Sequence, residues 1–191
     1  MLDPFCCGVA GLLRRPLALY VAAMSERIDP DVVGDDRTSL LTELDFQRGT
    51  VRMKAAGLSD EAAAHSLVPS PTTVTGVVQH LAEVERSWFR AVLAGDGWRS
   101  NFDYDADPDA EFRVTSETSL AAVLLDYEAA CDESRQAYAD VQLDDVARGP
   151  RSRPPLHPTL RWILVHMIAE TARHNGQLDI LREQLDGAVG E

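Results

Sequence analysis

Hydrophobic residues recur at helical spacing in four long stretches of the chain, and no long stretch alternates between apolar and polar residues. The four stretches cover about residues 36–56, 73–94, 116–140 and 159–186. Gly57, Gly95 and Gly187 stop three of them, and a short helical turn is expected at 60–65. Each helix would bury one apolar face, so the pattern predicts an all-α protein built as a four-helix bundle.

Two long connections separate the predicted helices. Residues 95–115 carry glycine, proline and many aspartates, and residues 148–158 are rich in arginine and proline. Loops of this length are uncommon in compact domains and are often functional, so we expect both to flank a site. The aspartates at 103–109 lack the glycine turn and closing glutamate of a calcium loop, and we interpret them as solvated.

The first residues differ from the rest of the chain. The stretch 5–23 is apolar but is interrupted by Arg14, Arg15 and Pro16, which leaves pieces too short to span a bilayer. A secretory signal would place its positive charges before the apolar run. We therefore expect translation to begin at Met24, with residues 1–23 an extension or a misassigned start. An amphipathic segment that touches a membrane or a partner is the alternative.

Composition narrows the possible partners. The chain has 191 residues, 45% of them hydrophobic and 26% charged, which is typical of a globular protein. A net charge of −13 without a basic stripe disfavours binding to nucleic acid. Lys54 is the only lysine beside many arginines, which indicates a GC-rich bacterial coding sequence. The cysteines form neither a disulfide framework nor a zinc spacing, so we expect a reducing cytoplasm, with Cys131 in the core.

Candidate chemistry lies in the fourth predicted helix. His166, Glu170 and His174 follow one another at intervals of four residues. The two histidines are about 12 Å apart along the helix axis, so one ion cannot bind both. A helical wheel turns His174 toward the apolar face, leaves Glu170 at its edge and turns His166 away. We therefore pair Glu170 with His174 and place His166 outside the ligand set.

His80 in the second helix can complete this pair. It lies on the flank of its helix that carries Val84, where it could face a neighbouring helix. Two imidazoles and one carboxylate form the ligand set of a catalytic zinc with an open fourth position. On spacing alone, a structural hydrogen bond between Glu170 and His174 is the simpler interpretation.

A resemblance to the DinB superfamily lies in two strings, HLAEVERSWFRAVLAG at 80–95 and LRWILVHMIAETARHNGQLDILREQLDG at 160–187. The segments LLTELDFQRGTVRMKAAGLSDE and LVPSPTTVTGVVQH fit the same pattern, so the resemblance covers about residues 38–187. It implies a four-helix bundle with a divalent metal between helices. The usual ligands are one histidine on the second helix and His-x-x-x-His on the fourth, whereas Glu170 replaces the first of these here.

This replacement resembles the thiol-dependent maleylpyruvate isomerases of the same superfamily, whose zinc site uses His, Glu and His. The resemblance therefore implies His80, Glu170 and His174 as ligands of zinc or nickel. It also implies an S-transferase or isomerase that uses a low-molecular-weight thiol, mycothiol in a GC-rich bacterium, to attack an electrophile. A metal-dependent hydrolase and a non-catalytic bundle stabilised by metal, acting through dimerisation or a partner, are the alternatives. We also consider a homodimer.

Other residues have two interpretations each. Glu85 projects from the apolar face of the second helix and needs a partner, for which Arg182 and Arg161 are candidates. Gln177 could orient a ligand, although a surface amide is the simpler interpretation. The tryptophans at 88, 98 and 162 could line a pocket or serve only in packing.

Overall fold

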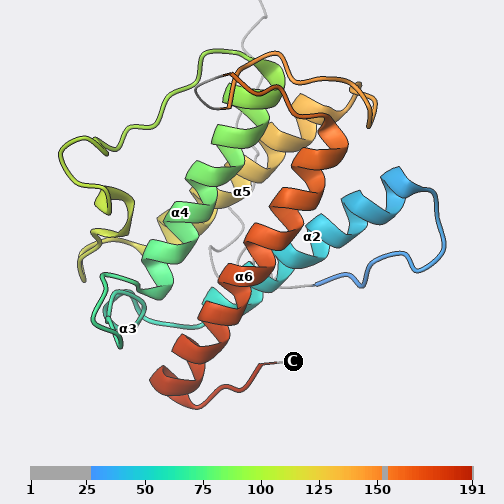
Figure 1. The fold of residues 1–191 in the computed structure, drawn as a ribbon. Helices are drawn as coiled ribbons and strands as arrows, with labels where there is room; N and C mark the ends of the chain where they lie inside the picture. The colour runs from blue at the N-terminus through green and yellow to red at the C-terminus, as the bar shows by residue number, and fades with distance from the viewer. Residues whose placement is uncertain (1–26, 152–154, 191) are drawn as a thin grey trace, which may run out of the picture.

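Four long helical stretches pack side by side in the computed structural model, which describes residues 27–151 and 155–190 (Figure 1). They are α2 (Asp36–Ala55), α4 (Val74–Arg86) continued by the π-helix η1 (Ser87–Ala94), α5 (Leu120–Tyr138) and α6 (Leu160–Asp186). A short α3 (Asp60–Ala63) and a 3₁₀ turn η2 (Ala110–Phe112) lie in the connections. The predicted all-α four-helix bundle is confirmed.

The helix ends follow from side-chain caps and glycines. A Ser, Thr or Asp side chain accepts a backbone N–H at the start of every α-helix that the structure describes; the capping residues are Asp35, Ser59, Thr73, Ser119 and Thr159. Helix α5 begins at Leu120 because Ser119 caps it. The predicted start near residue 116 is therefore wrong. Gly95 ends η1 in the left-handed conformation, with φ of +63°.

The long connection between η1 and α5 returns along α4, so that α4 and α5 run parallel (Figure 1). Near the end of this connection, the carbonyl oxygen of Glu111 in η2 accepts a 2.5 Å hydrogen bond from Gln79 Nε2 of α4. At the other end of α4 and η1, the Gly149 N–H donates to the Val92 carbonyl over 2.8 Å. A Cβ atom at Gly149 would overlap the carbonyl oxygen of Ala91, so a glycine lets the chain at this position approach η1.

The core is one apolar layer between the four helices, divided into two clusters. The cluster near α3 includes Val51, Val77, Leu81, Tyr127 and Leu178, and the cluster near the other end of the bundle includes Leu44, Phe89, Leu160, Ile163 and Met167. Cys131 is fully buried in the first cluster, as predicted, and burial raises the pKa of its thiol. The described helices include none that is long and apolar enough to cross a membrane.

The buried partner of Glu85 is Arg48 of α2, so the expectation of Arg182 or Arg161 is wrong. The Arg48 guanidinium donates to both carboxylate oxygens of Glu85 over 2.7 Å, and neither side chain is more than 1% exposed. Arg182 instead donates to backbone carbonyls at the end of α2 and pairs with Asp186, and Arg161 pairs with acidic residues at the surface. A helical wheel shows that Glu85 faces inward, but it does not show which helix lies opposite.

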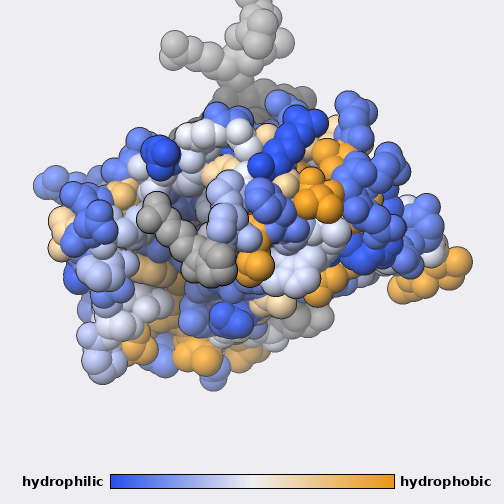
Figure 2. Space-filling model, turned by 45° about the horizontal axis from the view of Figure 1, so that its top comes forward, coloured by the Kyte–Doolittle hydropathy of each residue, from blue (hydrophilic) through white to orange (hydrophobic). Residues whose placement is uncertain are grey.

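Exposed apolar surface occurs in separate places among hydrophilic side chains at the end of the bundle that carries the long loops (Figure 2). Trp162 at 51% exposed and Leu156 at 63% exposed are two of the large apolar residues that are exposed. The expected start at Met24 and the character of residues 1–23 fall outside the described residues.

Candidate metal centre

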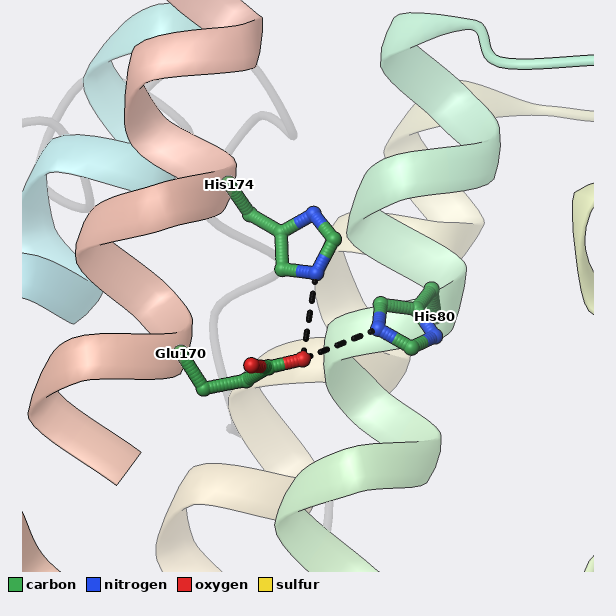
Figure 3. A group of neighbouring side chains, drawn as sticks. All are labelled: His80, Glu170 and His174. Atoms are coloured by element: carbon green, nitrogen blue, oxygen red, sulfur yellow. Dashed lines mark hydrogen bonds and ion pairs between the residues drawn. The ribbon is translucent and has the colours of Figure 1, made fainter. Parts of the chain in front are cut away.

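Three side chains from two neighbouring helices meet in the space between α4 and α6 (Figure 3). His80 projects from α4, and Glu170 and His174 project from α6. Their potential ligand atoms all lie within 4.8 Å of one another. Glu170 Oε1 is 3.3 Å from Nε2 of His174 and 3.7 Å from Nε2 of His80. The structure thus brings together the three residues that the sequence singled out.

Each histidine is held by a hydrogen bond on the side of its ring that faces away from Glu170. His80 Nδ1 lies 2.9 Å from Glu111 Oε1, and His174 Nδ1 lies 2.8 Å from Gln177 Oε1. A carboxylate and an amide oxygen can only accept, so both imidazoles carry their proton on Nδ1. The lone pairs of both Nε2 atoms therefore point toward Glu170.

Burial and charge fix the protonation of the cluster. Burial lowers the pKa of His174, and the nearby His80 lowers it further, so that the imidazole is neutral at pH 7. Burial alone would raise the pKa of Glu170, but the nearby His174, Arg173 and His80 together outweigh burial and lower it. The cluster therefore holds a carboxylate and a neutral histidine at physiological pH.

The chemistry of this donor set fits a divalent cation. Two imidazole lone pairs and a carboxylate oxygen converge, and each of these three atoms is an electron-pair donor. Without a cation or a proton between them, three such atoms repel one another. Two histidines and one glutamate form a ligand set that binds zinc and leaves a fourth position for a small molecule. The residues present thus fit a metal ion with an open coordination position.

Glu111 is a functional candidate that sequence reasoning missed. It lies in η2, directly after the aspartates that we interpreted as solvated, yet it is buried. Tyr104 donates a 2.9 Å hydrogen bond to its second carboxylate oxygen, and the Phe112 ring stacks on His80 at 5.1 Å. Burial, together with the hydrogen bond to Glu111, raises the pKa of Tyr104 to about 12. The available signal was Phe112, an apolar residue that directly follows an acid near the end of the long connection.

Gln177 has both roles that were considered. Its side chain is exposed, as expected for a surface amide, and its oxygen accepts the hydrogen bond from His174. It therefore orients a candidate ligand residue rather than a substrate. Such partners of metal-binding histidines set the tautomer and the direction of the free nitrogen.

His166 stays outside the cluster, as the helical wheel predicted. Its ring stacks on Trp162 with centroids 5.1 Å apart and planes 7° apart, and its centroid lies 4.5 Å from that of Trp88. Burial lowers the pKa of His166. Trp88 is 4% exposed and is mainly a packing residue, whereas Trp162 is 51% exposed.

A pocket of about 250 Å³ opens beside His80. Besides His80, it is lined by Glu83, Val84, Ser87, Trp88, Trp98, Ser100, Tyr104, Glu111 and Arg151. The loop 95–115 supplies Trp98, Ser100 and Tyr104, and the loop 148–158 supplies Arg151. The described parts of both long connections thus reach the pocket beside His80.

The polar side chains of this pocket are bonded to one another. The Ser100 hydroxyl donates to the Glu83 carboxylate. Burial raises the pKa of Glu83, although this hydrogen bond opposes the rise. The pocket therefore offers hydroxyl, carboxylate and indole groups close to the candidate ligands.

Comparisons with known proteins agree with this fold. The crystal structure of a conserved protein from Enterococcus faecalis is similar to the chain with a TM-score of 0.57 and 19% sequence identity. The match covers 82% of this chain and 100% of that chain, and at this identity it supports the fold alone. No curated protein matches the chain.

A family model described as mycothiol-S-transferase matches residues 39–187. The matched segment contains all four long helices except the first turn of α2, both long loops and the three clustered side chains. The match covers most of the chain and agrees with the DinB-like bundle that the sequence resembles. The chain belongs to the mycothiol S-transferase family.

Proposed function

We propose that this protein transfers a low-molecular-weight thiol of the mycothiol type to an electrophilic carbon, with a zinc or nickel ion held by His80, Glu170 and His174. The observation that carries the proposal is the convergence of both Nε2 lone pairs and Glu170 beside a pocket bounded by two long loops. Membership of the mycothiol S-transferase family supports the choice of thiol.

The chemistry needs a thiolate at neutral pH. A divalent cation at this site would lower the pKa of a thiol that occupies its open position. The sulfur electron pair forms the new C–S bond, the leaving group departs with the electrons of the bond that breaks, and the thiol proton passes to solvent. A reducing cytoplasm suits such a thiol and is part of the proposal.

The chain's own residues orient the reactants. Glu111 and Gln177 keep the two imidazoles in the tautomer that presents Nε2 to the centre. Glu83, Ser100 and Trp98 line the pocket beside His80, where carboxylate and hydroxyl groups suit a hydroxyl-rich thiol. The roles of these residues are therefore binding and positioning.

A transfer assay tests the proposal. The purified protein is incubated with a chromogenic electrophile and, in parallel, with mycothiol, bacillithiol, glutathione or no thiol. We expect thiol-dependent turnover that is fastest with mycothiol and that disappears in Glu170→Gln. Hydrolysis of a small molecule without any thiol would replace the proposal with the hydrolase, and inactivity in every assay would favour a non-catalytic bundle.

A further inference from the structure

A second pocket of about 440 Å³ lies next to the one that contains His80. It is lined by Arg151, Leu156, His157, Pro158, Thr159 and Trp162. Arg151 lines both pockets, and Trp88 of the first pocket contacts Trp162 of the second with centroids 5.5 Å apart. The two pockets are therefore neighbours that share Arg151, and the nearer one is lined by the candidate ligand His80.

The second pocket is mainly apolar and has a flat wall. The Trp162 indole lies nearly parallel to the His166 ring, and this stack fixes its orientation. Trp162 is 51% exposed and Leu156 is 63% exposed, although residues of this size are usually more buried. An aromatic ring that enters the pocket would stack on Trp162 and remove this surface from water. The volume is within the range of small-molecule sites.

Arg151 gives this apolar pocket a positive charge. Its guanidinium lies 4.5 Å above the centroid of the Trp88 ring, and no carboxylate of residues 27–151 or 155–190 pairs with it. This is notable in a chain with net charge −13, where acidic partners are plentiful. A guanidinium stacked on an indole keeps its in-plane N–H groups available for a carboxylate.

We propose that the electrophile of the transfer reaction is an aromatic carboxylic acid, whose ring stacks on Trp162 and whose carboxylate binds Arg151. The assignment rests on the proposed function, because it is the position beside the His80 pocket that makes the bound acid an electrophile for the thiol. The apolar wall selects the ring and Arg151 selects the anion. A neutral aromatic compound keeps only the first of these contacts.

Direct binding tests the pocket without metal or thiol. The full chain, freed of metal, is titrated calorimetrically with 2-naphthoate and with 2-naphthamide. We expect the naphthoate to bind about tenfold more tightly, as for one partly exposed charged hydrogen bond. Arg151→Gln should remove this preference, and Trp162→Ala should weaken the binding of both compounds by the same factor. Arg148→Gln is the matched control, because Arg148 is exposed in the same loop but lines a different pocket.

A kinetic comparison tests the role in transfer. With 4-(bromomethyl)benzoate as electrophile, the benzylic C–S bond forms, bromide leaves with the C–Br electron pair, and the thiol proton passes to solvent. Arg151→Gln should raise KM about tenfold for this acid and should raise KM for 4-(bromomethyl)benzamide much less.

The two proposals fail in different ways. Equal binding of naphthoate and naphthamide, or a preference that survives in Arg151→Gln, overturns the carboxylate pocket whatever the transfer assay shows. If binding depends on Arg151 but no thiol transfer occurs, the proposed function is overturned and the bound acid is not an electrophile. The pocket is then a binding site for aromatic acids. Transfer to the benzoate and the benzamide with equal KM overturns the pocket's role and leaves the transferase intact.

Discussion

Glu111 Oε1 accepts a 2.9 Å hydrogen bond from Nδ1 of His80, although the two residues are 31 positions apart in the chain and lie on different elements. This contact ties the long loop to the face of α4 that carries the candidate ligand. It turns the His80 Nε2 atom toward Glu170 and His174. The loop is thus part of the cluster's support and not only its border.

Removal of this contact should weaken metal binding. We expect Glu111→Ala to raise the metal dissociation constant about 10–100-fold, because His80 loses the partner that fixes its tautomer and direction. Competition with a chromogenic chelator measures the constant. Asp109→Ala, an exposed acid just before η2, is the control and should change affinity little. Equal affinity of Glu111→Ala and the unchanged protein would show that the contact has no part in orienting His80.

Metal content should follow the three clustered residues. Protein purified without chelator is expected to hold close to one divalent ion per chain, and His174→Ala should lose it because one of only two imidazole ligands is gone. His166→Ala should retain the ion, because that ring stacks on Trp162 instead of facing the cluster. Elemental analysis of the variants measures this. A metal-free His166→Ala beside a fully loaded His174→Ala would reverse our assignment.

The buried ion pair should matter for folding. Glu85→Ala leaves the fully buried Arg48 with only the half-exposed Asp45 as an anionic partner, and we expect a loss of about 3 kcal/mol in the free energy of unfolding. Chemical denaturation provides the value. In the control, Asp132→Ala removes an exposed partner of Arg135 and should cost less than about 1 kcal/mol. Similar losses in the two variants would mean that Arg48 finds another partner.

Acid should remove the stabilisation that Asp45 contributes beside Arg48. Burial would raise the pKa of Asp45, but the charges and hydrogen bonds of Arg48 and Arg135 outweigh burial and lower this pKa below its ordinary value of 3.8. The unfolded state then binds the proton first, so the stabilisation from Asp45 is complete above about pH 5 and is lost as the pH falls through the lowered pKa. The difference in unfolding free energy between the unchanged protein and Asp45→Asn should shrink below about pH 4. Growth of the difference on acidification would contradict this sign.

The fold was predictable because each helix carries its own signals. Apolar spacing placed α2, α4 and α6 within two residues of their observed starts, and glycines marked two of the stops. The start of α5 was placed too early because the polar residues before Ser119 fit a helix as well as a turn. The π-helical form of η1 was not predicted, because the same apolar residues suit both kinds of helix.

The candidate ligands were also accessible to sequence reasoning, but their supports were not. Glu170 and His174 share one helix, so their relative positions follow from helix geometry. Glu111 reaches His80 only because a long connection returns along α4, and Arg48 reaches Glu85 only because α2 lies opposite it. Such pairings depend on the arrangement of elements that are distant in the chain, which periodicity does not report.

Binding of a thiol by the metal is the most direct evidence for thiol activation at this centre. The protein is loaded with cobalt, and its absorption spectrum is recorded before and after the addition of mycothiol, with the corresponding alcohol as control. We predict a sulfur-to-metal charge-transfer band with the thiol alone, because His80, Glu170 and His174 leave a position open for sulfur. A cobalt spectrum that the thiol leaves unchanged would contradict the proposal that this centre activates a thiol.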